Sequence, residues 1–154
     1  MINMIFIGSD HGGLEMKEEL VKVLASRNQP VKDCGTTNGE SVDYPDFAEK
    51  VAGAVSRGEA ELGILVCGTG IGMSIVANKF PGVRAALATD EFMAQMAKEH
   101  NNANILVLGG RVLSVELATK MVNVWLDTAY EGGRHQLRLD KISQVEAAVR
   151  SGEL

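Results

Sequence analysis

The sequence places one cysteine where a reactive thiol could act. Cys67 follows the apolar run Leu62–Val66 and begins a glycine-rich loop, residues 67–72, with the sequence CGTGIG. Glycines allow a ligand to approach the backbone closely, and successive amide groups in such a loop bind anions. At a turn that leads into a helix, the thiolate is favoured over the thiol. The motif predicts a reactive thiol beside an anion-binding loop, although a lone cysteine is also commonly a small buried core residue.

Two other uses of a glycine loop fit these residues less well. A cysteine phosphatase requires an arginine six positions after its nucleophile, and Met73 occupies that position. A dinucleotide-binding fold requires the pattern GxGxxG and an acidic residue about 20 positions later. Asp90 lies at about that distance, but the glycines here follow the pattern GxGxG. Phosphatase chemistry is therefore excluded, and nucleotide binding remains an alternative.

Further polar residues stand at the ends of predicted elements. Asp10 and His11 follow the first apolar run, and His100 ends a predicted helix. Each also has an ordinary interpretation, because aspartate commonly caps helices and the dipole at a helix C-terminus favours a histidine cation. Arginines beside the late glycine pairs could clamp a phosphate in an acidic protein, although surface arginines are usually just solvated. These arginines are Arg111, Arg134 and Arg138.

The elements that must position these residues follow from the hydrophobic pattern. Short apolar runs alternate with segments of helical period, which is typical of βα units around a parallel sheet. One three-layer α/β domain over residues 1–154 is predicted, Rossmann-like or flavodoxin-like, with a five-stranded, mostly parallel sheet. The predicted helices cover about residues 14–24, 45–58, 72–79, 90–100, 114–130 and 140–150. The predicted strands are Met4–Gly8, Pro30–Asp33, Leu62–Val66, Val83–Ala88 and Ile105–Leu108.

In such a sheet the ligand crevice lies at the carboxyl ends of the strands. Glycines gather after the first, third and fifth predicted strands. We therefore expect the thiol, the loop amides and a phosphate anchor to meet at one edge of the sheet. Among the helical residues, helical spacing places Met93, Met96 and Trp125 in the core and puts the apolar residues of the last helix, Ile142, Val145 and Val149, on one side.

Composition and charge exclude several classes of partner. The chain has a net charge of −5 and no basic block, so it lacks the footprint of a nucleic-acid-binding or membrane-surface protein. No apolar run approaches the roughly 20 residues of a membrane span, and a cytoplasmic protein is expected. The two cysteines are too few for a disulfide framework or a zinc site, so we expect free thiols and no metal.

Seven segments, in order and over nearly the whole chain, resemble the type B ribose-5-phosphate isomerases, a family of sugar-phosphate isomerases. A set of this kind is far more specific than any one glycine loop. The segments are residues 8–13 (GSDHGG), 43–48 (DYPDFA), 67–72 (CGTGIG), 77–79 (ANK), 100–101 (HN) with Asn104, 109–112 (GGRV) and 131–135 (EGGRH).

The resemblance implies an aldose–ketose isomerase that interconverts ribose 5-phosphate and ribulose 5-phosphate without a metal or cofactor. It implies that Cys67 removes the C2 proton, that Thr69 assists proton transfer at the sugar oxygens, and that His100 opens the furanose ring with help from Asp10. One branch of the family uses a glutamate base at the position of Met73, whereas this chain keeps the cysteine. The implied substrate-binding residues are Asp10, His11, Tyr44, Gly68, Gly70, Ile71, Gly72, Asn101, Arg111, Arg134 and Arg138.

The resemblance further implies a homodimer or a dimer of dimers, with the site at the subunit interface and residues drawn from both chains. The same scaffold is similar to the subunits of galactose-6-phosphate isomerase and to allose-6-phosphate isomerases. A hexose phosphate therefore remains an alternative substrate. A non-catalytic phosphosugar- or nucleotide-binding protein is the alternative from a different class.

Overall fold

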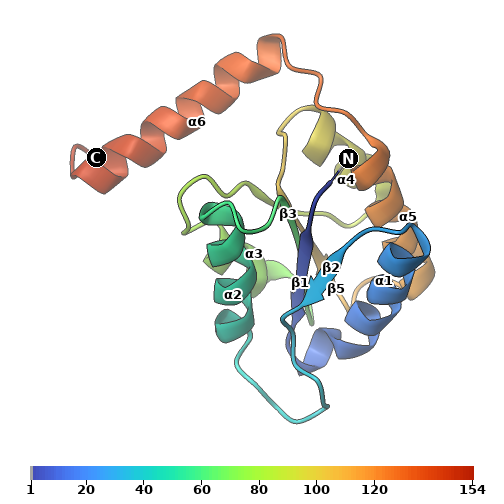
Figure 1. The fold of residues 1–154 in the computed structure, drawn as a ribbon. Helices are drawn as coiled ribbons and strands as arrows, with labels where there is room; N and C mark the ends of the chain where they lie inside the picture. Colours follow the sequence, from blue (N-terminus) through green and yellow to red (C-terminus); the bar gives the residue numbers. More distant parts are fainter. Residues whose placement is uncertain (1) are drawn as a thin grey trace.

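Five short strands lie side by side in one sheet in the computed structural model, which describes residues 2–154 (Figure 1). Strands that are buried on both faces read as continuous apolar runs, and the three inner strands β1, β3 and β5 do so here. The order across the sheet is β2-β1-β3-β5-β4, and every pairing is parallel. The strands are β1 (Ile5–Ser9), β2 (Val31–Asp33), β3 (Leu62–Cys67), β4 (Ala85–Leu87) and β5 (Ile105–Gly109).

Helices cover both faces of this sheet, so the predicted three-layer α/β fold is confirmed. Buried residues of α1, α4 and α5 form one core cluster with the sheet, and those of α2 and α3 form another on the opposite face. Relative to the flavodoxin order 2-1-3-4-5, the last two strands are exchanged. The helices are α1 (Leu14–Ser26), α2 (Tyr44–Ser56), α3 (Ile71–Ala77), α4 (Glu91–Glu99), α5 (Val115–Asp127) and α6 (Arg134–Ser151), with a short 3-10 turn, η1, at His11–Gly13.

Register places the ends of the central strands together. Ser9 of β1 pairs with Val66, and Cys67 pairs with Gly109 of β5. Because all the strands run the same way, these residues lie at one edge, the carboxyl edge of the sheet. The segments that follow β1, β3 and β5 therefore meet there, as the sequence pattern predicts.

The C-terminal helix departs from the prediction. Helix α5 ends at Asp127 rather than near residue 130, and α6 begins at Arg134 rather than near residue 140. Gly132 and Gly133 both have positive φ, a conformation that glycine adopts without strain, and they turn the chain directly into α6. The break therefore occupies fewer residues than expected, and α6 is correspondingly longer.

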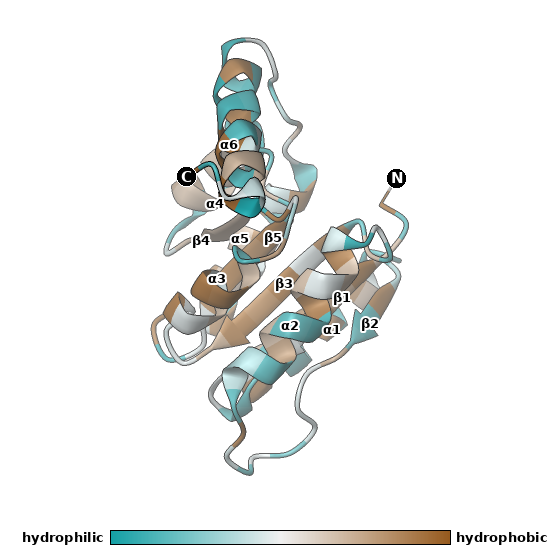
Figure 2. Ribbon diagram, turned by 90° about the vertical axis from the view of Figure 1, so that its left-hand side faces the viewer, coloured by the Kyte–Doolittle hydropathy of each residue, from teal (hydrophilic) through white to brown (hydrophobic). Residues whose placement is uncertain are grey.

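Helix α6 projects away from the sheet (Figure 1). Its apolar residues Ile142, Val145 and Val149 lie on one side as predicted, yet each is half exposed or more. Figure 2 shows that α6 carries brown, apolar bands among teal, polar ones, whereas the inner strands are mostly brown. Trp125 is buried as expected, but Met93 is 41% exposed, so its assignment to the core was wrong.

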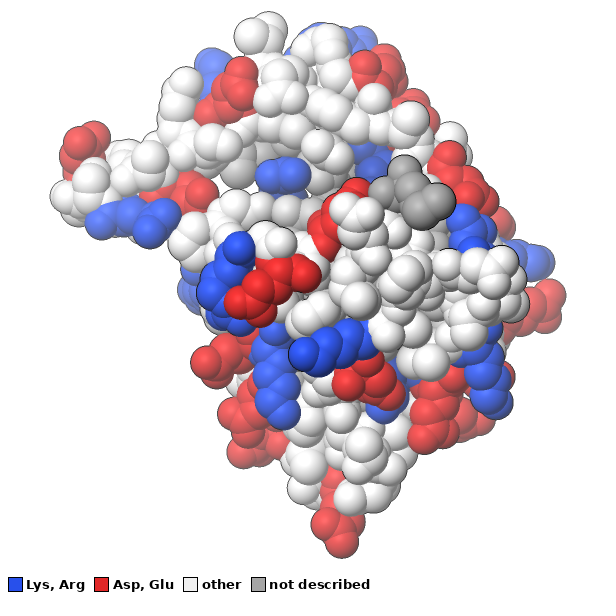
Figure 3. Space-filling view, in the orientation of Figure 1, with Lys and Arg blue, Asp and Glu red and all other residues white. Residues whose placement is uncertain are grey.

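The surface carries both signs of charge. On the face seen in Figure 3, lysine and arginine side chains alternate with aspartate and glutamate, without a broad field of one sign. Within residues 2–154, no helix combines the length and apolar character needed to cross a membrane.

One buried cation ties α1 to the segment that leads toward α2. The Lys17 side chain is 2% exposed, and its Nζ lies 2.9 Å from Oδ2 of Asp33 at the end of β2. It also donates a hydrogen bond of 2.7 Å to the Thr36 carbonyl. A buried charge is tolerated only when it is paired in this way. Lys17 therefore fixes the start of the loop that runs over the carboxyl edge of the sheet.

We expect Lys17→Met to lower the free energy of unfolding by about 1–3 kcal/mol, because the Thr36 carbonyl loses its donor and Asp33 loses its cation. Denaturant unfolding followed by circular dichroism measures the loss. Lys22→Met is the matched control on the same helix, since Lys22 is exposed and pairs only with Glu19. Equal stability of the Lys17 variant and the parent protein would contradict the structural role of this ion pair.

Candidate active site

The end of β1 holds Asp10 in a fixed position. Its Oδ1 accepts a hydrogen bond of 3.1 Å from the Gly13 amide, and its own amide donates to the Val66 carbonyl. A Cβ built on Gly13 would lie 2.5 Å from that same Val66 carbonyl oxygen. Only glycine fits there, so the turn after β1 packs directly against the end of β3. The buried Asp10 carboxylate is thereby held beside the cysteine loop.

Cys67 ends β3 with its thiol turned into the loop that follows. The residue is 5% exposed, and its Sγ accepts a hydrogen bond of 3.1 Å from the Gly70 amide. Gly70 has a φ of +82°, and a Cβ on it would approach the backbone of Leu108 to 3.1 Å. The Thr69 hydroxyl accepts a hydrogen bond from the Ile71 amide. Cys67 is therefore buried like a core residue, yet its sulfur meets a backbone amide that would stabilise a thiolate.

The second cysteine has a different setting. Cys34 is only partly buried, and this burial raises the pKa of its thiol. A raised pKa disfavours the nucleophilic or basic thiolate. The setting of Cys34 therefore does not favour a chemical role.

Arg111 reaches the same loop from β5. The Gly110 amide donates to the Cys67 carbonyl at 2.7 Å, and the Arg111 amide donates to the Gly68 carbonyl at 2.9 Å. A Cβ built on Gly68 would lie 3.2 Å from Nη1 of Arg111, and one built on Gly12 would lie 3.4 Å from Nη2. The guanidinium therefore stands between the two glycine turns, where it can meet an anion.

Two ring side chains border these turns. Tyr44 begins α2, and its ring lies directly against the Cα of Gly72. The His11 Nδ1 accepts a hydrogen bond of 3.2 Å from the Val42 amide. In a neutral His11 imidazole the proton is then on Nε2, and Nε2 can donate a hydrogen bond to a ligand.

These side chains form what we call the thiol half-site. It lies between the carboxyl ends of β1 and β3, where the helices that follow these strands, α1 and α3, leave for opposite faces of the sheet. This is the usual ligand crevice of an open parallel sheet. The sequence predicts this grouping, and the structure brings its members together. The half-site comprises Asp10, His11, Tyr44, Cys67, Gly68, Thr69, Gly70, Ile71, Gly72 and Arg111.

The remaining predicted residues gather elsewhere, in what we call the histidine half-site. His100 follows the last residue of α4, and its ring stacks on that of His135, with centroids 4.1 Å apart and planes at 15°. Arg134 and Arg138 lie one turn apart on α6, with their side chains exposed. The side chains His100, Asn101, Arg134, His135, Arg138 and Leu139 line a cavity of about 370 Å³.

The two half-sites occupy opposite edges of the sheet, which corrects the expectation of a single edge. Helix α4 begins after β4 at the carboxyl edge and runs back, so His100 lies near the amino ends of the strands. The Asn101 carbonyl accepts a hydrogen bond from Arg84, which immediately precedes β4. Six residues of β3 at about 3.3 Å each separate the edges by roughly 20 Å. The two half-sites of one chain therefore cannot contact the same small ligand.

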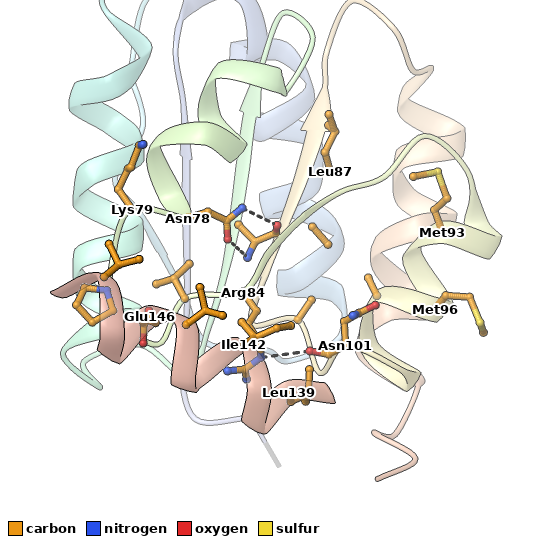
Figure 4. A pocket seen from close by; sticks show the side chains of 18 of the residues that line it. Asn78, Lys79, Arg84, Leu87, Met93, Met96, Asn101, Leu139, Ile142 and Glu146 are labelled. Atoms are coloured by element: carbon orange, nitrogen blue, oxygen red, sulfur yellow. Dashed lines mark hydrogen bonds between the residues drawn. The ribbon is translucent and has the colours of Figure 1, made fainter. Parts of the chain in front are cut away.

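A larger cavity of about 750 Å³ lies between α6 and the edge of the domain formed by α3, β4 and α4 (Figure 4). Leu139 and Ile142 of α6 line one wall, and Leu87 and Met93 line others. A hydrogen bond of 3.0 Å from the Gly82 amide to Glu146 crosses the cavity rim. Sequence reasoning missed this cavity because the apolar residues that line it carry the same helical pattern as core residues.

Sequence reasoning also gave no role to His135 or to Glu131. Glu131 Oε2 lies 3.7 Å from Nε2 of His135, and the two residues are four positions apart. That spacing was the available signal, because residues i and i+4 can meet at the start of a helix. With His100 they form a group of three side chains whose ligand atoms lie within 4.8 Å of one another, and no other such group is found in the described part of the chain.

Comparison with known proteins places this arrangement among sugar-phosphate isomerases. The family model of the ribose/galactose isomerases matches residues 5–142, a range that contains every predicted site residue. The chain is 47% identical to ribose-5-phosphate isomerase B of Escherichia coli over 142 residues, which cover 92% of this chain and 95% of that protein.

Solved structures agree with this match. Ribose-5-phosphate isomerase B of Clostridium thermocellum has a TM-score of 0.93 at 52% identity, covering 95% of this chain and 99% of that one. The Mycoplasma genitalium ribose-5-phosphate isomerase B, solved with bound ribulose 5-phosphate, has a TM-score of 0.91 at 43% identity, covering 94% and 96%. The similarity thus extends over both half-sites.

We expect Gly70→Ala to destabilise the protein by about 1–3 kcal/mol, because alanine is strained at positive φ and its methyl group meets the backbone of Leu108. Thermal unfolding measures the loss, and iodoacetamide labelling of Cys67 should become faster as the loop is displaced. Gly39→Ala is the control, since a Cβ there meets nothing within 4 Å. Parallel behaviour of the two variants would show that the loop tolerates another conformation.

Proposed function

This chain belongs to the ribose/galactose isomerase family, and from that premise we propose that it interconverts ribose 5-phosphate and ribulose 5-phosphate. The observation that carries the proposal is the Cys67 thiol at the end of β3, 3.1 Å from a loop amide and next to the arginine-bearing turn after β5. An aldose–ketose isomerisation needs a base, donors for the sugar oxygens and a phosphate anchor. It would act in the cytoplasm, in the non-oxidative pentose phosphate pathway.

The proposed proton transfer uses Cys67 as the base. The thiolate takes the proton from C2 of open-chain ribose 5-phosphate, and the electron pair of that C–H bond forms the C1–C2 double bond of an enediolate. The thiol then returns the proton to C1, which gives ribulose 5-phosphate. A single base thus suffices, and the step consumes no electron carrier, metal or second substrate.

The glycine loop would stabilise the charge that develops on the sugar oxygens. Backbone amides of Gly68 to Gly72 would face the enediolate and stabilise its charge. Those of Gly70 and Ile71, which donate to Cys67 Sγ and to the Thr69 hydroxyl, would exchange these partners for the sugar oxygens. The Thr69 hydroxyl would exchange a proton between the two oxygens. Within the same half-site, the Asp10 carboxylate and the Tyr44 ring would hold the sugar hydroxyls.

We propose that the complete site is shared by two copies of the chain. The thiol half-site and the histidine half-site lie at opposite edges of one sheet, yet both carry residues that the reaction needs. A two-fold dimer would place the thiol half-site of one copy against the histidine half-site of the other, and would form two equivalent sites. His100 would then open the furanose ring held by the partner, and Asn101 would contact the sugar.

The arginines would divide in the same way. Arg111 and His11 of one chain and Arg134 and Arg138 of the other would surround the phosphate. Bidentate arginine contacts suit a phosphate dianion, and the chain's net charge of −5 makes local cations necessary. The four groups would fix the sugar by the end that does not react.

The apolar side of α6 supports the dimer. Ile142, Val145 and Val149 are exposed on a helix that projects from its own domain. Phe92 and Met93 are also exposed, and they line the same cavity as these residues; Met93 is labelled in Figure 4. Exposed apolar surface of this kind is typical of an interface. A second copy, with its own α6, would cover it and bring the charged first turn of α6 to the neighbouring thiol half-site.

We expect Cys67→Ala to lower kcat for ribose 5-phosphate by about 10²–10⁴-fold, because the general base is lost while the fold persists. A coupled assay of ribulose 5-phosphate formation, run in parallel with allose 6-phosphate and galactose 6-phosphate, measures the effect and the preference. Cys34→Ala is the matched control and should retain the parent rate. Near-normal turnover by the Cys67 variant would refute the thiol base, and a higher rate with a hexose phosphate would replace the proposed substrate.

We expect two inactive variants to rescue each other when their chains are mixed. Cys67→Ala damages the thiol half-site, and the double variant Arg134→Ala, Arg138→Ala damages the histidine half-site. Co-refolded dimers should reach about one quarter of the parent activity, since half are mixed and each mixed dimer has one intact site. An absence of rescue in dimers shown to be mixed would contradict the shared site.

The matched control for this mixing experiment changes α6 itself. Val145→Glu in both chains should abolish the rescue, because a charge on the apolar side opposes pairing. Ala147→Glu, about 200° around the helix, should leave the rescue intact. Sedimentation velocity reports whether each mixture remains dimeric.

A further inference from the structure

Three side chains from separate segments offer metal ligands at the histidine half-site. His100 caps α4, His135 lies in the first turn of α6, and Glu131 belongs to the loop before α6. One ligand atom from each lies within 4.8 Å of the others. Glu131 Oε2 is 3.7 Å from Nε2 of His135 and 4.0 Å from Nε2 of His100. Both Nε2 atoms therefore lie near the same carboxylate oxygen.

A second observation points to a cation at this place. The His135 side chain is only 9% exposed, and its Nε2 has no hydrogen-bond partner among residues 2–154. Buried polar atoms in proteins almost always have a partner, so an orphaned nitrogen needs an explanation. A lone pair on this nitrogen, facing an acidic side chain, fits a bound cation.

We propose that His100, His135 and Glu131 bind a divalent transition-metal ion of the Zn²⁺ type. Two imidazoles and a carboxylate are common zinc ligands, and imidazole nitrogen favours Zn²⁺, Cu²⁺ and Ni²⁺ over Mg²⁺ or Ca²⁺. Glu99, whose Oε1 is 3.7 Å from Nε2 of His100, or a water molecule completes a tetrahedral set.

Backbone hydrogen bonds hold the segments that carry the three ligands in place, whereas the exposed side chains can adjust. The Glu131 amide donates to the Glu99 carbonyl at 2.9 Å, and the His135 amide donates to the Gly132 carbonyl at 3.1 Å. Ligand bonds of about 2.0–2.2 Å place neighbouring ligand atoms roughly 3.3 Å apart. The two distances from Glu131 to the histidine nitrogens exceed this by less than about 1 Å, which rotation of the half-exposed Glu131 side chain can close. The two histidine nitrogens lie within 4.8 Å of each other, and the partly exposed His100 ring must tilt out of the stack for both lone pairs to meet one ion.

The ion would regulate the enzyme rather than take part in the reaction. This consequence, unlike the binding itself, rests on the proposed function, in which Nε2 of His100 opens the sugar ring. A metal bond occupies the lone pair of that nitrogen. Micromolar zinc would then inhibit turnover of ribose 5-phosphate, and a chelator would restore it.

Isothermal titration with ZnCl₂ and with MgCl₂ tests the site on the intact protein without substrate. We expect one zinc ion per chain and no comparable magnesium binding. Glu131→Gln and His135→Gln should each weaken zinc binding about ten-fold or more. Zinc also binds thiols, so the Cys34→Ser, Cys67→Ser double variant is titrated in parallel and should keep the zinc site. His11→Ala is the control for the one histidine outside the cluster.

Unchanged zinc affinity in both cluster variants, no binding by the parent protein, or loss of the site in the double cysteine variant would each overturn the proposal. Thermal unfolding of each variant shows whether it is folded. If His135→Gln is unstable, Glu131→Gln still tests the site, because the Glu131 side chain is half exposed and its replacement should not affect folding. Because binding is measured without turnover, the titration tests the zinc site independently of the proposed isomerase activity. Zinc binding without inhibition would overturn the regulatory role alone.

Discussion

Parallel strands impose the constraint on which the rest of this structure depends. All five strands run the same way, so everything that follows a strand lies at one edge and everything that follows a helix lies at the other. Cys67 is the last residue of a strand, and His100 follows a helix. No adjustment of loops brings the two together within one chain, because a strand of six residues lies between them. An assembly of two chains is the simplest geometry in which both can meet one substrate.

Much of the fold and one half of the candidate site could be predicted from the sequence. The apolar run that ends at Cys67 is a buried central strand, and the glycines after it mark the turn that faces the thiol. These features are local in sequence, and backbone sterics determine them: Gly13 is required by the Val66 carbonyl, and Gly70 by its positive φ. The thiol half-site is assembled from such turns, so its prediction needed only the direction of the strands.

The other half could not be placed in this way. Hydrophobic period shows which side of a helix is apolar, but it does not show what covers that side. Val145 and Met93 carry the pattern of core residues, yet the structure leaves both exposed. The hydrophobic pattern of one chain does not show which surface would cover Val145 and Met93. The same limit applied to His135, whose contacts with His100 and Glu131 depend on where α6 begins, and two glycines of positive φ determine that point.

The separation of the half-sites also bears on how such an enzyme can evolve. With the two halves at opposite edges, and if each site is completed by a neighbour, the two functions of the chain are under separate selection once the gene is duplicated. One copy can lose its thiol loop and the other its histidine cluster, while a mixed pair still holds one complete site. The surviving active site would then belong to neither gene product alone, and each copy would be free to reshape its own half toward a different sugar.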